Sequence, residues 1–93
     1  MDFDTQAELL YADLNDSEKE MIQYIKSHKP EVINMTINEL AKILLSSKSS
    51  VLRLAKKLGF TGYSELKYAL KKEIVKKAII PTDLVETYKK EIN

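Results

Sequence analysis

Hydroxyl and basic side chains gather between residues 47 and 57. The members of this group are Ser47, Lys48, Ser49, Ser50, Arg53, Lys56 and Lys57. Lysine and serine side chains can hold phosphate oxygens, and an arginine guanidinium can donate two hydrogen bonds to one guanine edge. We expect Arg53 to contact a base edge, with a phosphate contact or a surface salt bridge as its alternative, and the lysines to contact phosphates.

A helix is needed to present these side chains on one surface. Apolar residues with the i, i+3, i+4, i+7 spacing of one helix face predict a helix over residues 48–58. These apolar residues are Val51, Leu54, Ala55 and Leu58. Ser47 is a suitable N-cap, and Gly59 lies where helices commonly end in a left-handed residue. At about 100° per residue, the opposite face carries Ser49, Arg53, Lys56 and Lys57.

A second short helix precedes this one. Thr36 and Glu39 are the two ends of a capping box that begins a helix over residues 37–44. Its inward residues are Ile37, Leu40, Ala41 and Leu44. Two short helices joined by a brief turn, the second basic on its outer face, are typical of a helix-turn-helix. Thr36 and Asn38 lie where backbone N–H groups can receive a phosphate, although capping is the favoured role for Thr36.

The rest of the chain predicts further helices and no strands. Their expected ranges are residues 3–13, 15–27, 63–78 and, as a helix or an exposed linker, 82–92, with a single helical turn at 31–35. Two glycines and two prolines are too few for the repeated tight turns of an all-β domain. We therefore expect an all-α fold, a five- to six-helix bundle that contains the helix-turn-helix.

Composition argues against several classes of function. The chain has no cysteine and one histidine, His28, so thiolate metal sites, cysteine nucleophiles and histidine clusters are not expected. No paired carboxylate and base and no glycine-rich phosphate loop is recognisable, so we expect no enzyme, no cofactor and no metal. No apolar run approaches the roughly 20 residues that span a bilayer, and residues 1–4 are acidic, unlike a secretory signal. We expect a cytoplasmic protein.

The charge is unevenly distributed along the chain. The net charge is +1, from 15 Lys and Arg against 14 Asp and Glu. Residues 1–47 contain four Lys against nine acidic residues, a net of −5, whereas residues 48–93 contain eleven basic and five acidic residues, a net of +6. The near-neutral total therefore conceals a basic half that suits a phosphate-rich partner.

The helix expected over residues 63–78 contains two further candidate site residues and suggests an alternative function. Lys67 is expected to contact phosphate, and the Tyr63 hydroxyl could do so as well, although an aromatic residue close to Phe60 is more often part of a hydrophobic cluster. The Lys-rich face of this helix would also suit an acidic protein partner. A helical protein-protein adaptor is therefore the alternative to a nucleic-acid-binding domain.

Residues 14–73 carry motifs that resemble a known family. They are Leu-Asn-Asp-Ser-Glu-Lys (14–19), Met-Thr-Ile-Asn-Glu-Leu-Ala (35–41), Ser-Ser-Val-Leu-Arg-Leu (49–54) and Lys-Lys-Leu-Gly-Phe-Thr-Gly-Tyr-Ser-Glu-Leu-Lys (56–67). This stretch resembles the N-terminal domain of RpiR-type regulators, bacterial transcription factors that respond to phosphosugars. The last motif is the most specific, because generic helix patterning does not account for its turn.

The resemblance implies a winged-helix-like or purely helical domain that binds double-stranded operator DNA as a homodimer. Arg53 matches the arginine of the family's recognition helix, and Ser47, Ser49 and Ser50 fall at its opening. Leu45 and Ser46 replace the family's usual small and apolar residues, so we expect a longer or differently wound turn.

The resemblance also implies a division of the chain. Residues 1–80 would form the DNA-binding domain, and 81–93 a linker or extra helix leading to an absent sugar-isomerase-type domain that binds the phosphosugar.

In the first helix Leu10 and Tyr11, if exposed, would provide the dimer surface.

Overall fold

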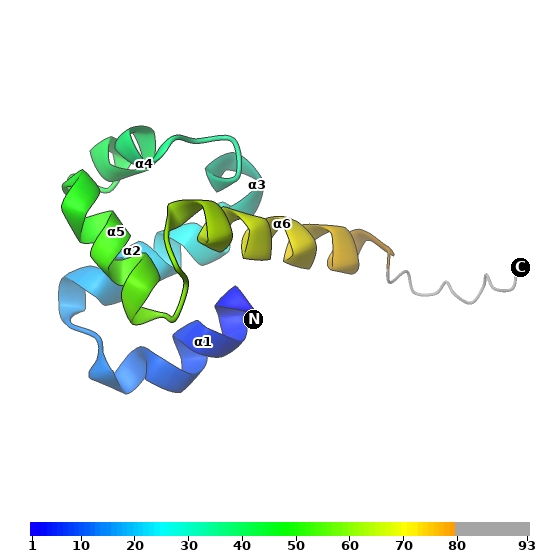
Figure 1. Cartoon of the computed structure of the whole chain (residues 1–93), viewed down its shortest axis with the longest axis horizontal. Helices are drawn as coiled ribbons and strands as arrows, with labels where there is room; N and C mark the ends of the chain where they lie inside the picture. The colour runs from blue at the N-terminus through cyan, green and yellow to red at the C-terminus, as the bar shows by residue number, and fades with distance from the viewer. Residues whose placement is uncertain (80–93) are drawn as a thin grey trace, which may run out of the picture.

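The structure, a computed structural model, describes residues 1–79, and these residues form helices (Figure 1). They are α1 (Phe3–Leu10), the 3₁₀ helix η1 (Tyr11–Asp13), α2 (Asp16–Ser27), α3 (Lys29–Val32), α4 (Ile37–Ile43), α5 (Lys48–Lys57) and α6 (Tyr63–Ile79). Residues 1–79 contain no strand, and the expected all-α class is confirmed. The helix or linker expected over 82–92 lies outside the described residues.

Capping side chains begin the helices where the sequence predicts. The Asn15 side chain accepts a hydrogen bond from the Glu18 N–H at 2.8 Å, and the Asn15 N–H donates to Glu18 Oε1 at 2.9 Å. Thr36 and Glu39 form the same reciprocal pair, at 3.1 and 2.8 Å. Both capping boxes are confirmed, so the starts of α2 and α4 follow from the local sequence.

Two of the expected helices have different boundaries in the structure. The first helix ends at Leu10 and continues as the tighter turn η1, after which Leu14 is extended, with φ −92° and ψ 146°. This extended residue enters the core and leaves Asn15 in place to cap α2. Helix α3 is Lys29–Val32, so it begins two residues and ends three residues earlier than expected. It can begin at Lys29 because Pro30 is tolerated in a first turn, where its missing N–H is not needed.

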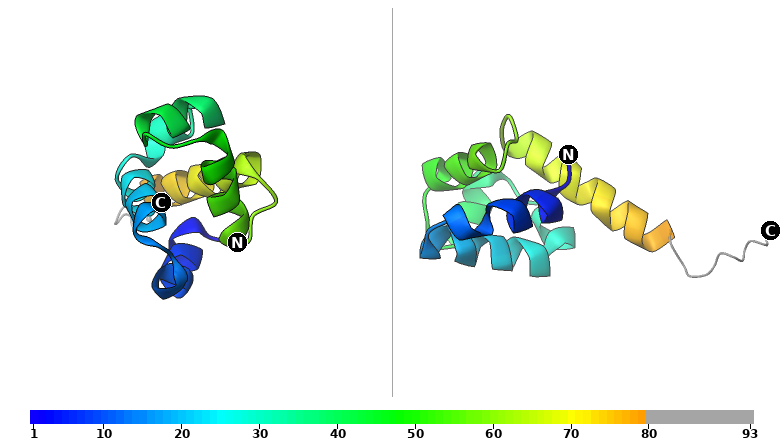
Figure 2. Two further views of the ribbon diagram at one scale, coloured as in Figure 1. Left: turned by 90° about the vertical axis from the view of Figure 1, so that its left-hand side faces the viewer. Right: turned by 90° about the horizontal axis from the view of Figure 1, so that it is seen from below.

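One hydrophobic core joins all six α-helices. Its most deeply buried side chains are Phe3, Ile22, Ile25, Val32, Leu40, Val51, Leu54, Leu58, Leu66 and Leu70. Helix α6 runs through the middle of the bundle and projects beyond it (Figures 1 and 2). Because α6 contacts α1 and α3 as well as α5, it connects the second helix of the helix-turn-helix to the N-terminal part of the bundle.

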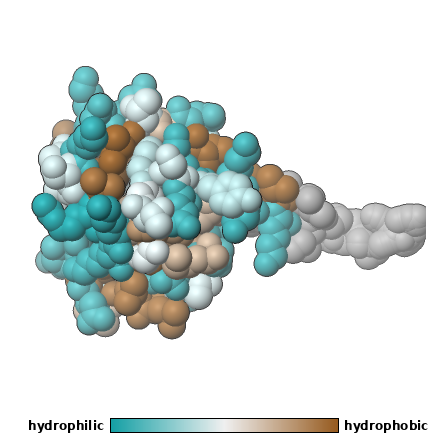
Figure 3. Space-filling model, viewed as in Figure 1, coloured by the Kyte–Doolittle hydropathy of each residue, from teal (hydrophilic) through white to brown (hydrophobic). Residues whose placement is uncertain are grey.

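The face of the molecule seen in Figure 3 is mostly hydrophilic. In Figure 3 a small apolar patch lies among hydrophilic side chains over α5, and another lies over α1. None of the helices in residues 1–79 is long and apolar enough to cross a membrane. Within the same residues, no three acidic or histidine side chains come together where they could hold a metal ion.

Candidate nucleic-acid interface

Helices α4 and α5 pack against each other and are joined by residues 44–47. At the end of α4 the Ser46 N–H donates to the Ala41 carbonyl at 2.8 Å, and the Leu45 N–H donates to the Lys42 carbonyl at 3.1 Å. This pair of bonds is a Schellman motif. Leu45 supplies the left-handed residue that the motif requires, with a φ of 54°. The turn is therefore short. Of the two expected departures from the family, a longer turn is not found, and a different winding stays a prediction.

Helix α5 begins at the expected cap. The Ser47 hydroxyl accepts a hydrogen bond from the Ser50 N–H at 3.1 Å and lies 2.9 Å from the Ser50 hydroxyl. Because one hydroxyl hydrogen is shared between the two oxygens, the other stays available for an outside acceptor. The first turn of α5 contains no acidic residue, so its positive dipole end meets no negative side chain of its own turn.

The outer side of α5 carries exposed cations. Lys48, Ser49, Arg53 and Lys56 are all exposed, while Val51, Leu54 and Ala55 on the other side are buried. Within residues 1–79, Lys48, Arg53 and Lys56 have no carboxylate within 4.0 Å. The predicted juxtaposition of a serine and basic residues on one exposed side of the helix is therefore present in the structure.

Lys57, the fourth predicted member of this face, is also exposed but forms an ion pair with the body of the domain. Its Nζ donates to Glu18 Oε1 at 3.0 Å, the oxygen that also caps α2. Burial opposes ionisation of Glu18, but the bonds from the Asn15 N–H and Lys57 outweigh it and lower the pKa of this carboxyl. Lys57 therefore ties the C-terminal end of α5 to the start of α2.

Tyr63 and Lys67 both hold the chain that enters α4. The buried Tyr63 hydroxyl donates to the Met35 carbonyl at 3.0 Å, and Lys67 Nζ donates to the same oxygen at 3.2 Å. Burial raises the pKa of Tyr63 to about 12, with a smaller contribution from the negative charge of Glu39. Lys67 Nζ also lies 5.2 Å from the centre of the Tyr63 ring. These two side chains fix the position from which α4 starts.

Thr36 and Asn38 are exposed at the beginning of α4. The Thr36 hydroxyl accepts from the Glu39 N–H, so its capping role is confirmed. Their contact with phosphate stays a prediction.

The family follows from a match over most of the chain. The family model described as the helix-turn-helix domain, rpiR family, matches residues 1–77. This chain belongs to the rpiR family of helix-turn-helix domains. Such domains are the DNA-binding parts of transcriptional regulators and are not enzymes, so family membership favours DNA binding over the adaptor alternative.

Relatives of this rpiR-family domain are bacterial regulators. The chain is 48% identical over 63 residues to the HTH-type transcriptional regulator GlvR of Bacillus subtilis, covering 68% of the chain and 25% of the relative. It is 41% identical over 61 residues to the HTH-type transcriptional regulator CPE0189 of Clostridium perfringens, and this match covers 66% of the chain and 22% of the relative. The match to the crystal structure of the N-terminal domain of ybbH from Bacillus subtilis has a TM-score of 0.65 at 31% identity, and it covers 72% of this chain and 82% of the chain in that structure. The chain spans about a quarter of the length of the curated relatives.

The contacts that attach α1 to the rest of the rpiR-family domain were not predicted from the sequence. The Gln6 side chain donates to the Leu58 carbonyl at 2.8 Å, at the end of α5. Lys29 Nζ lies 2.6 Å from Asp4 and 2.9 Å from Glu73, linking α1 and α3 to α6. Burial lowers and the two carboxylates raise the pKa of Lys29, and the net shift is upward. No periodicity marks these residues, because their partners lie far away in the sequence.

Proposed function

We propose that this domain binds double-stranded DNA in a sequence-specific way, with α5 in the major groove. The observation that carries the proposal is the division of α5 into a buried apolar side and an exposed side with a serine and three cations. A helix of this kind can lie in the groove while its inner side stays anchored in the core. The excess of basic over acidic residues after residue 47 supports the same orientation.

Each side chain of the site has a proposed role. Arg53 donates to a guanine edge, and Lys48 and Lys56 contact phosphates on either side of it. The hydroxyls at the start of α5, together with Thr36 and Asn38, contact the sugar-phosphate backbone. Lys57, Tyr63 and Lys67 act mainly by holding α5 and α4 in place, because the structure gives their polar groups partners within the domain.

Selection of binding sites from random duplex DNA tests the proposal. A recurrent motif is expected, with an affinity that falls by about 0.9 decade per decade of salt for each phosphate contacted. Arg53→Ala should weaken binding to the selected site by about 1–3 kcal/mol and leave random DNA almost unaffected. The control is Lys71→Ala, which removes an exposed cation of α6. Failure of the wild-type domain to bind any duplex at low salt would overturn the proposal.

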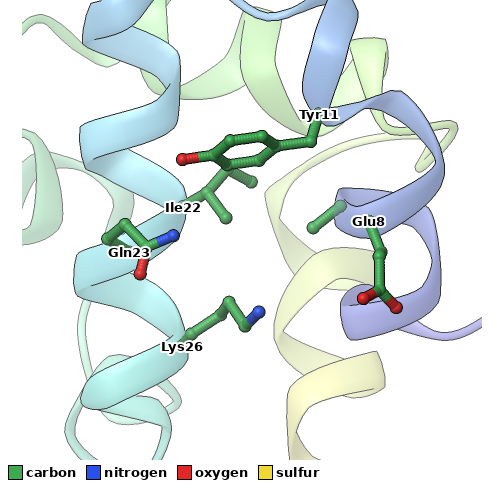
Figure 4. A pocket seen from close by; sticks show the side chains of 6 residues that line it. Glu8, Tyr11, Ile22, Gln23 and Lys26 are labelled. Carbon is green, nitrogen blue, oxygen red and sulfur yellow. The ribbon is translucent and has the colours of Figure 1, made fainter.

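We further infer that two copies associate through α1. Leu10 and Tyr11 pack partly against the core, so the exposed apolar residue of this helix is Leu9, at 72%. Beside α1 a hollow of about 450 Å³ is lined by Ala7, Glu8, Tyr11, Ile22, Gln23 and Lys26. Figure 4 shows Glu8 on α1 and Lys26 on α2 on opposite walls of this hollow. A patch with one acid and one base can pair with a copy of itself about a two-fold axis.

Sedimentation equilibrium tests the association. Leu9→Glu should shift the protein toward the monomer, whereas Val75→Glu, at an exposed apolar position of α6, should not. A monomeric wild-type protein, both free and on a palindromic selected site, would contradict the inference.

The resemblance to phosphosugar-responsive regulators supports a role in the control of sugar metabolism in the bacterial cytoplasm. We assign effector binding to a region other than the helix-turn-helix domain. A sugar phosphate added to this chain should therefore leave its melting temperature unchanged, and a clear increase would contradict the assignment.

A further inference from the structure

Leu52 is an apolar residue of α5 that does not belong to the hydrophobic core. Val51, Leu54 and Ala55 of the same helix are buried in the core, whereas Leu52 is only half-buried. It is also absent from the partly buried side chains that pack against the core. Part of this apolar side chain therefore stays exposed outside the core.

The position of Leu52 on the helix places it beside the residues proposed to face DNA. It follows Ser49 by three residues and precedes Lys56 by four, and such residues are neighbours on a helix surface. Ser49 and Lys56 are both exposed.

The chemistry of leucine restricts what it can contact in a major groove. Leucine offers no hydrogen bond to a phosphate or to a polar base edge, and it would remove water from such groups at a cost. The apolar group that base pairs present in the major groove is the C5-methyl of thymine. We propose that Leu52 is a specificity-determining residue that contacts a thymine methyl in each half-site, an inference that rests on the proposed function.

Replacing thymine by uracil tests this contact, because the exchange removes the methyl group and keeps every hydrogen-bonding group of the base pair. Uracil is introduced at one thymine of the selected site at a time, and the affinity is measured by fluorescence anisotropy. At one position in each half-site, the wild-type domain should bind uracil DNA about three- to fivefold more weakly, the effect expected for losing one methyl contact. With Leu52→Ala the ratio at that position should fall to about one.

Two variants complete the experiment. Leu52→Met, which keeps a long apolar side chain, should restore the preference for thymine. Val75→Ala should keep the wild-type ratio at every position, because Val75 is an exposed apolar residue of α6, outside the proposed DNA surface. Circular dichroism of each variant shows whether the helices are retained.

The outcomes separate this inference from the proposed function. If Leu52→Ala binds the selected site and still distinguishes thymine from uracil as the wild type does, the assignment of Leu52 is wrong and DNA binding stands. If wild-type affinity is the same for thymine and uracil at every position, the assignment is equally wrong. If no duplex binds to the wild-type domain, both proposals fail.

Discussion

Leu45 is predicted to destabilise the domain through its backbone conformation. Its φ of 54° lies in the left-handed region, which costs a residue with a Cβ atom about 1–2 kcal/mol. Its side chain is 95% exposed, so it recovers almost none of this cost by burial. At the end of α5 the equivalent position of the same motif is held by Gly59, with a φ of 100°. Leu45 thus carries a strain that glycine avoids.

Leu45→Gly should therefore stabilise the domain. Removing about 1–2 kcal/mol of strain is partly offset by the additional freedom of glycine in the unfolded chain, about 0.5–1 kcal/mol. The net gain is about 0.5–1 kcal/mol, which in a domain of this size corresponds to an increase in Tm of about 2–8 °C. Thermal denaturation followed by circular dichroism measures it, with urea denaturation as the independent estimate.

Leu45→Ala is the matched control, because alanine removes the exposed side chain and keeps the Cβ atom. Its stability should stay within about 0.5 kcal/mol of the wild type. An equal gain from alanine would show that the exposed leucine side chain, and not the left-handed backbone, is responsible. A Leu45→Gly variant no more stable than the wild type would refute the reasoning altogether.

Three further predictions concern the core and the charges. Leu54→Ala should lower the free energy of unfolding by about 2–5 kcal/mol in urea denaturation, because Leu54 is 1% exposed; a loss below about 1 kcal/mol would contradict its place in the core. Lys56→Gln should reduce the slope of log affinity for DNA against log salt concentration by about 0.9 and leave the Tm unchanged. Lys57→Gln should instead lower the Tm, since Lys57 binds Glu18. Equal effects of the two variants on the slope would disprove this distinction. Glu18→Gln keeps a capping side chain and loses the ion pair, at a cost of about 0.5–1 kcal/mol at neutral pH. The pKa of Glu18 is lower in the folded than in the unfolded protein, so the stability difference between wild type and Glu18→Gln should be complete above the unfolded-state pKa and vanish as the pH falls through the folded-state pKa. If urea denaturation well below the folded-state pKa still shows this stability difference, the ion pair is not its cause.

The features that the sequence predicted well depend on residues close together in the chain. The capping boxes at 15–18 and 36–39 and the Ser47 cap join side chains to backbone groups three positions away. The left-handed Gly59 likewise ends the helix that precedes it directly. Such signals need no knowledge of the tertiary fold, so helix starts and the buried side of α5 could be predicted from the residues themselves.

The roles of the basic and aromatic site residues could not be predicted in this way. Lys56 and Lys57 are adjacent, identical in type and both exposed, yet only Lys57 binds a carboxylate, 39 positions away in the chain. Tyr63 and Lys67 share the Met35 carbonyl, 28 and 32 positions away. Residue type does not distinguish a lysine that is proposed to contact phosphate from one that fastens two helices together, and the sequence predicts both on the basic side of α5. The partner decides between them, and the partner is known only from the fold.

These long-range contacts explain how a short helix can be held at a defined tilt. The C-terminal end of α5 is fixed by the Lys57 ion pair and by the hydrogen bond from Gln6 to the Leu58 carbonyl. Its N-terminal end follows α4, whose own start is fixed by the two bonds to the Met35 carbonyl. Side chains that read base edges must be placed to within a fraction of an ångström, which requires the helix that carries them to be supported from outside. For the proposed base recognition by α5, the polar residues that face inward are therefore as necessary as the cations that face outward.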